Sequence, residues 1–102
     1  MTDRQKLNLV ISNEAKNDLI QIISFIKKDN IKAARNVITL LQKSCEILAL
    51  FPNMGSNNPK IKLEDAKILI IKWQYVIVYK IENNDLVILK FLSKYQDICN
   101  LL

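Results

Sequence analysis

Phe51-Pro52-Asn53-Met54-Gly55 divides this sequence into two halves with different periodicity. Pro52 cannot continue a helix, because proline lacks a backbone N–H and its ring clashes with the preceding turn. Gly55, the single glycine of the chain, readily takes a left-handed or otherwise strained backbone conformation. We therefore expect one sharp turn here, between a helical first half and a second half made of strands.

Two helices are predicted before the turn, over residues 13–28 and 31–50. Apolar residues recur every three or four positions in both segments, which is the spacing of one face of a helix. Ser12 or Asn13 can cap the first helix, and Asp29-Asn30 breaks it and can cap the second. The short connection makes the two helices antiparallel neighbours.

Four strands are predicted, over residues 7–11, 67–72, 75–81 and 86–92, because these segments are rich in β-branched and aromatic residues. Glu82-Asn83-Asn84-Asp85 is a good hairpin connection, since Asn tolerates a positive φ. Tyr75 and Tyr79 are expected to share one packed sheet face. The residues expected in the core are Leu19, Ile22, Ile26, Val37, Leu41, Leu48, Ile77 and Ile88.

The pattern predicts an α+β fold in which an antiparallel helical hairpin packs on a small, largely antiparallel four-stranded sheet. A chain of 102 residues is expected to form one domain, spanning residues 1–102. No apolar run approaches the ~20 residues that a membrane span needs, and residues 1–6 do not look like a secretory signal. We expect a soluble, cytoplasmic protein without a membrane partner.

The composition excludes several kinds of chemistry. The chain has no histidine, which removes Ser-His-Asp catalysis and histidine-ligated zinc sites. One glycine is too few for a glycine-rich phosphate loop. Cys45 and Cys99 lack the close spacing of a zinc or redox pair, so both are expected to be reduced thiols, and neither a metal nor a cofactor is expected. The net charge of +5 permits an acidic protein or nucleic-acid partner, and a solvated lysine face explains it equally well.

The order of these features resembles the RelE/ParE family of toxin subunits in bacterial toxin-antitoxin pairs. The segments that carry the resemblance are residues 14–26 and 33–52 for the helix pair, the Phe-Pro-x-x-Gly turn, and the Tyr-x-x-x-Tyr strand 75–81. It extends from about Ile11 to Leu101. The ParE branch is the most similar one, because its long helix pair and Pro-x-x-Gly turn both occur here.

The resemblance implies the toxin of a type II, plasmid-stabilisation type system, which poisons DNA gyrase by binding and needs no catalytic residue. It also implies a cognate antitoxin as partner, and either a homodimer or a hetero-oligomer with that antitoxin. The matching target-binding segment follows the last strand, and its candidate residues are Lys90, Lys94, Tyr95 and Asp97. Ser93-Lys94-Tyr95-Gln96-Asp97 keeps the aspartate of the ParE-like pattern but lacks its histidine and two arginines, and Ser56 replaces the basic residue usual after the glycine.

Two alternatives remain open at this point. One is a ribosome-dependent mRNA endonuclease of the RelE type, acting on mRNA at the ribosome. In that case Lys60, Lys62, Lys67 and Lys94 would bind and polarise phosphate, and Tyr95 would assist acid-base steps. The absence of Arg and His from residues 51–102 counts against this alternative, because lysine lacks the bidentate fork of arginine. The other is a degenerate family member that binds its antitoxin without being toxic.

Overall fold

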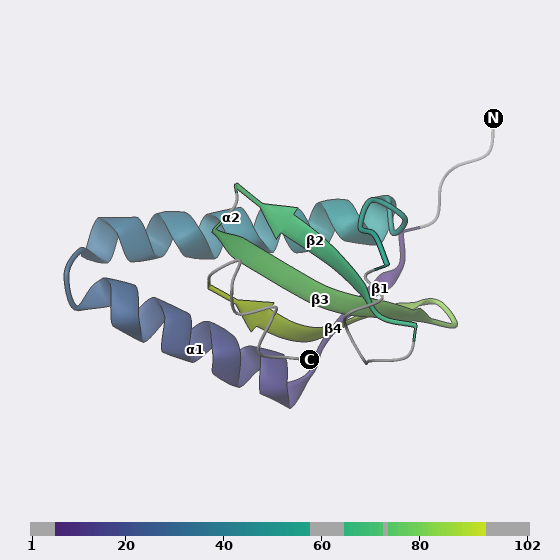
Figure 1. Ribbon diagram of the computed structural model, residues 1–102, viewed down its shortest axis with the longest axis horizontal. Coiled ribbons are helices and arrows are strands. Elements are labelled where there is room, and N and C mark those ends of the chain that lie inside the picture. Colours follow the sequence, from purple (N-terminus) through teal and green to yellow (C-terminus); the bar gives the residue numbers. More distant parts are fainter. Residues whose placement is uncertain (1–5, 58–64, 73, 94–102) are drawn as a thin grey trace.

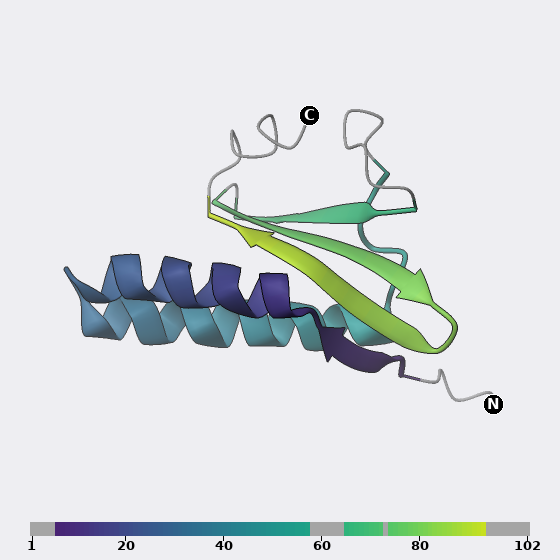
Figure 2. The same ribbon diagram turned by 90° about the horizontal axis from the view of Figure 1, so that it is seen from below.

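The computed structural model describes residues 6–57, 65–72 and 74–93. Six elements follow one another along the chain: β1 (Asn8–Ile11), α1 (Asn13–Lys27), α2 (Ile31–Leu50), β2 (Lys67–Ile71), β3 (Tyr75–Glu82) and β4 (Asp85–Leu92). Each lies within one residue of its predicted bounds. The two helices form a layer on one face of the four-stranded sheet, which confirms the predicted α+β class (Figure 1 and Figure 2).

The sheet is mixed, with the strand order β1-β4-β3-β2. β3 pairs antiparallel with both β2 and β4, whereas β1 pairs parallel with β4. Parallel pairing requires a long crossover, and the helical hairpin is part of the connection that provides it. The β3–β4 hairpin turns at Asn83, which has a φ of 57°, as the sequence indicated.

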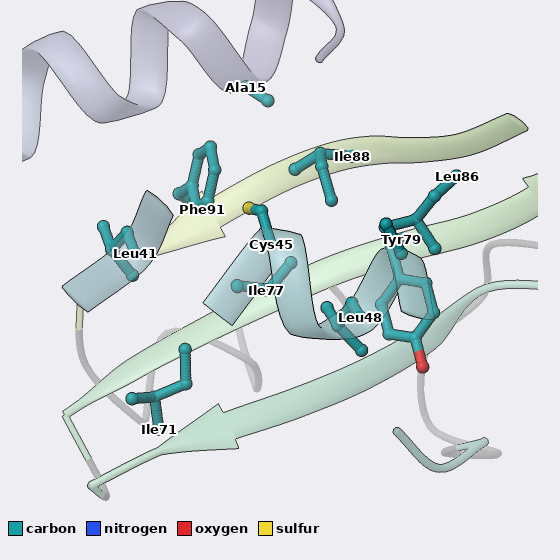
Figure 3. Close-up of a cluster of buried hydrophobic side chains, with 11 residues drawn as sticks. Ala15, Leu41, Cys45, Leu48, Ile71, Ile77, Tyr79, Leu86, Ile88 and Phe91 are labelled. Atoms are coloured by element: carbon teal, nitrogen blue, oxygen red, sulfur yellow. The ribbon is translucent and has the colours of Figure 1, made fainter. Parts of the chain in front are cut away.

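The main core lies between the helices and the sheet. Figure 3 shows its buried side chains, which come from both helices and from β2, β3 and β4. Leu41, Leu48, Ile77 and Ile88 are buried there, as predicted. Three more of the residues expected in the core are only partly buried but pack against this cluster; they are Leu19, Ile22 and Val37. Tyr79 belongs to the cluster and Tyr75 packs against it, so the two tyrosines share a sheet face.

Ile26 is a correction to the predicted core. It is half-buried and does not belong to the main cluster or to the partly buried residues packed on it. The reason is the length of the hairpin, whose connected end extends well beyond the end of the sheet in both views (Figure 1 and Figure 2). At that end the helices contact each other without a sheet beneath them.

A β-bulge in β4 adjusts which side chains face the helices. Val78 is opposite Lys90 but Tyr79 is opposite Ile88, so Leu89 is the extra residue on β4. Because of this shift, Ile88 and Phe91 both enter the main core although they are three positions apart. The alternate side chains of the sheet form a second buried cluster, made of Ala66, Ile68, Val76 and Val78.

Gly55 differs from the prediction in its backbone conformation. It has no positive φ, so the left-handed conformation that glycine allows is not what this position uses. The position is instead limited by space, because a Cβ atom on Gly55 would lie 2.6 Å from the carbonyl oxygen of Ile68. Ser56 forms a two-hydrogen-bond bridge with Ile68 and thereby draws the turn against β2. Glycine is needed here for a close approach of two backbone segments.

None of the helices in the part of the chain that the structure describes is both long enough and apolar enough to cross a membrane.

Candidate functional site

Only part of the predicted site lies within the described residues. Lys90 is near the end of β4, immediately before the segment that the resemblance marks as target-binding. Lys67 is the first residue of β2. Because β3 lies between β2 and β4, Lys67 and Lys90 are not on neighbouring strands. The remaining candidates lie outside the described residues; they are Lys60, Lys62, Lys94, Tyr95 and Asp97.

Lys90 is held by two carboxylates of α1. Its Nζ forms an ion pair and hydrogen bond with Glu14, and it lies 3.6 Å from Oδ2 of Asp18. The side chain of Lys90 is only 19% exposed. The hydrogen bond to Glu14 raises the pKa of Lys90 above its ordinary value, with Asp18 adding to the effect and burial opposing it. Lys90 therefore keeps its proton and is largely neutralised within the fold.

The same region shows how α1 completes the edge of β4. β1 ends at Ile11, opposite Ile88, so the outer edge of β4 beyond Ile88 has no strand beside it. The start of α1 takes this place. The N–H of Ser12 donates to the carbonyl oxygen of Ile88 at 3.0 Å, and its hydroxyl donates to that of Leu89 at 3.2 Å. The N–H of Phe91 donates to Oδ2 of Asp18 at 3.2 Å.

Ser12 and Asp18 thus join two elements that are far apart in the sequence. The Ser12 hydroxyl also accepts from the N–H of Ala15 at 3.1 Å, so a single side chain caps α1 and anchors β4. Sequence reasoning had predicted the cap but not the contact with β4. It had also missed Asp18 as a site residue, although Glu14 and Asp18 are four positions apart and thus lie on one helix face.

The pKa values of Cys45, Tyr79 and Lys90 are all shifted upward, away from neutral pH. Burial raises the pKa of Cys45 to about 11, with the Glu46 charge adding to the effect. Burial also raises the pKa of Tyr79, partly offset by its hydrogen bond with Gly55. Together with the raised pKa of Lys90, these shifts favour positioning and charge neutralisation over proton transfer near pH 7. Within residues 6–57, 65–72 and 74–93, no three Asp, Glu or Cys side chains come together as metal ligands.

A second surface is apolar and lies at an open sheet edge. β1 is an edge strand, and its start is tied to the end of α2 by a 2.9 Å hydrogen bond from the Leu7 N–H to the Ala49 carbonyl oxygen. Exposed apolar side chains are present on both elements, and we call them the β1 edge surface: Leu9, Val10, Ile47 and Leu50. An edge strand with apolar side chains is a ready template for an extended partner segment.

Comparisons with known proteins agree with this architecture. The family model described as "ParE toxin of type II toxin-antitoxin system, parDE" matches residues 9–98. No curated protein matches the chain in sequence. Among solved structures, the chain is similar to the chromosomal ParDE toxin-antitoxin system from P. aeruginosa, with a TM-score of 0.74 and 15% identity over 87% of this chain and 97% of that one.

Two further structures share the fold. The toxin-antitoxin complex RelBE2 from Mycobacterium tuberculosis matches with a TM-score of 0.60 and 14% identity, covering 92% of this chain and 98% of the other. The Helicobacter pylori protein HP0894 matches with a TM-score of 0.54 and 18% identity, covering 85% and 93%. The TM-scores of these three structures show that the fold is shared, and the family model covers residues 9–98 of this chain. The chain therefore belongs to the ParE toxin family of type II toxin-antitoxin systems.

Proposed function

We propose that this toxin acts by binding DNA gyrase and blocking it, without making or breaking a bond with its own side chains. The family membership over residues 9–98 is the observation that carries this proposal. Lys90 fits this proposal, because a lysine with a raised pKa that is paired with Glu14 and Asp18 is suited to positioning and not to proton transfer at neutral pH. Contact with gyrase is assigned to the segment from Lys90 to Asp97, with Lys94 and Tyr95 as its recognition residues.

Lys90 has a positioning role in this proposal. Its charge is engaged by Glu14 and Asp18, so it fixes the end of β4 against α1 and thereby sets where the following residues begin. Lys94, Tyr95 and Asp97 would then supply the direct contacts with the target. The distinction is testable, because loss of a positioning residue affects stability and activity together, whereas loss of a contact residue affects activity alone.

A cognate antitoxin is the second partner in the proposal. Two of the similar structures are described as a toxin-antitoxin system and a toxin-antitoxin complex. The β1 edge surface offers apolar side chains and the open edge of a parallel pair, which suits an extended antitoxin segment. The chain's net charge of +5 favours an acidic antitoxin.

The deciding experiment induces the chain in a bacterium and tests the purified protein in parallel on gyrase and on translating ribosomes. The proposal expects growth arrest with a DNA damage response, inhibition of DNA supercoiling, and intact ribosome-bound mRNA. Cleavage of mRNA at the ribosomal decoding site would establish the endonuclease instead. A protein that binds the neighbouring gene's product but leaves growth unchanged would be the degenerate member.

Two variants test the assigned segment. Lys94→Glu and Tyr95→Ala are expected to weaken growth arrest while leaving thermal unfolding and antitoxin capture nearly unchanged. If both variants arrest growth as well as the wild type, the segment is not the target-binding site.

A further inference from the structure

The connected end of the helical hairpin projects from the body of the protein. We call residues 24–36 the hairpin tip; it contains the last turn of α1, the connection, and the first turns of α2. In both views it extends past the end of the sheet (Figure 1 and Figure 2). No residue of the tip belongs to either buried cluster, and Ala34 is its only buried side chain.

The tip exposes large apolar side chains. Phe25 is 70% exposed and Ile31 is 56% exposed, although each is of a type that cores normally enclose. A projecting end that contributes little to the core gains no stability from displaying an aromatic ring and a branched aliphatic group. Apolar side chains gathered on a projecting surface are typical of a protein-protein contact.

The tip also has a strongly positive net charge. It contains one carboxylate, Asp29, and four cationic side chains, which are Lys27, Lys28, Lys32 and Arg35. The net charge of the tip is therefore +3, compared with +5 for the whole chain. All five of these side chains are exposed, and none forms an ion pair with another described residue. The first turn of α2 contains no acidic residue to balance Lys32. These cations are thus available to an acidic partner.

The backbone of the tip is already ordered by local hydrogen bonds. The Asn30 side chain accepts from the N–H of Ala33 at 3.0 Å and caps α2. The N–H groups of Asp29 and Asn30 donate to the carbonyl oxygen of Ile26 at 3.1 and 3.0 Å and close α1. A partner therefore meets a preorganised surface, which lowers the entropic cost of binding.

We propose that the hairpin tip is a second target-docking element, which inserts Phe25 into an apolar recess lined by acidic side chains on the protein that this toxin inhibits. This inference rests on the proposed function, because it presumes a protein target. A convex tip requires a concave partner, which a large folded target offers and a short extended antitoxin segment does not. Nucleic acid is a poorer match for Phe25 and Ile31, since its phosphate surface gives aliphatic groups no apolar pocket. A second copy of the tip would be repelled by its like charge.

The test uses the full chain and two charge-matched double variants. Lys28→Glu with Lys32→Glu reverses two charges at the tip, while Lys16→Glu with Lys43→Glu reverses two exposed lysines elsewhere on α1 and α2. Phe25→Ser removes the proposed anchor. Each variant is compared with the wild type for growth arrest, for co-purification with the product of the adjacent reading frame, and for its thermal unfolding temperature.

The proposal expects the tip double variant and Phe25→Ser to need roughly tenfold or more inducer for equal growth arrest, as for hot-spot residues. Both are expected to retain the wild-type unfolding temperature and to co-purify with the antitoxin. The control double variant is expected to arrest growth as the wild type does. Equal loss of toxicity in the control variant, or loss of antitoxin capture by the tip variants, would overturn the proposal.

Two further measurements distinguish the classes of partner, and they separate the role of the hairpin tip from the assignment of gyrase as the target. If wild type binds a DNA duplex, an RNA or vesicles with anionic lipid and the tip variants do not, the tip serves that partner and the proposal is wrong. Binding to purified gyrase is measured separately. If the wild type arrests growth without binding gyrase, the gyrase assignment fails while the variants still decide the role of the tip. A wild type that does not arrest growth would overturn the inference itself.

Discussion

The phenolic oxygen of Tyr79 accepts a hydrogen bond from the backbone N–H of Gly55 at 2.9 Å and donates one to the carbonyl oxygen of Pro52 at 2.7 Å. The ring of Tyr79 is buried in the main core, and its hydroxyl lies at the outer end of the side chain in Figure 3. One residue of the central strand β3 therefore fixes the turn that separates the helices from the sheet. Three predictions concern this turn and the core beneath it.

Tyr79→Phe is expected to lower the free energy of unfolding by about 1 to 3 kcal/mol, because it leaves the Gly55 N–H and the Pro52 carbonyl without their partner. Denaturant unfolding measures the loss. Tyr75→Phe is the matched control, since the Tyr75 hydroxyl forms no hydrogen bond with the described residues, and its cost is expected to stay below about 0.5 kcal/mol. Equal effects of the two changes would show that the turn does not depend on the Tyr79 hydroxyl.

Gly55→Ala is expected to destabilise the protein by about 1 to 3 kcal/mol through overpacking. The new Cβ would lie 2.4 Å from the Tyr79 hydroxyl and 2.6 Å from the Ile68 carbonyl oxygen. In the double variant with Tyr79→Phe the contact with the hydroxyl disappears, whereas the contact with the Ile68 carbonyl oxygen and one of 2.8 Å with ring carbon Cε1 of residue 79 remain. The double variant is therefore expected to lose less stability than the two single losses together, and strict additivity would contradict this account.

Leu41→Ala is expected to cost about 2 to 5 kcal/mol, because Leu41 is 2% exposed and its truncation leaves a cavity between α2 and the sheet. Ile20→Ala serves as the control, since Ile20 is 62% exposed on α1. Its cost is expected to stay within about 0.5 kcal/mol. A loss below about 1 kcal/mol for Leu41→Ala would mean that the α2 stripe faces something other than this core.

Lys90 is expected to stabilise the fold in a pH-dependent way that Lys90→Met removes. Its pKa is raised above the ordinary 10.5 by Glu14 first and then Asp18. Below the unfolded-state pKa lysine is charged in both states and the full stabilisation is present; it is lost as pH rises through the folded-state pKa. The difference in unfolding free energy between wild type and Lys90→Met is thus expected to be constant between about pH 7 and 10 and to shrink above it. A difference that grows in alkali would contradict the ion pair.

Cys45 is expected to be unreactive in the native protein, because it is buried and its pKa is raised to about 11. In a Cys99→Ser background, a thiol reagent at about pH 8 is expected to label Cys45 only as fast as the protein unfolds locally, because burial otherwise keeps the reagent from the thiol. Labelling is expected to accelerate in Leu41→Ala, since this variant opens more often. Rapid labelling of the stable wild-type background would show that Cys45 is accessible.

The sequence by itself determined the elements and their order. Period 3.6 over residues 13–50, and β-rich runs over residues 7–11 and after Gly55, placed every helix and strand of the described residues within one residue, because strong local patterns leave few competing structures. The hairpin turn at Asn83 followed from the tolerance of Asn for a positive φ. The resemblance also predicted the family, which the match over residues 9–98 confirms.

The tertiary structure decided how distant residues meet. The pairing of Lys90 with Glu14 and Asp18, and the closure of the β4 edge by Ser12, join positions more than seventy residues apart, which no local pattern encodes. The role of Gly55 was misjudged for the same reason, since the limiting atoms belong to Ile68 and Tyr79. The incomplete burial of Ile26 likewise depends on where the sheet ends beneath the helices, and this is decided only when the two layers pack together.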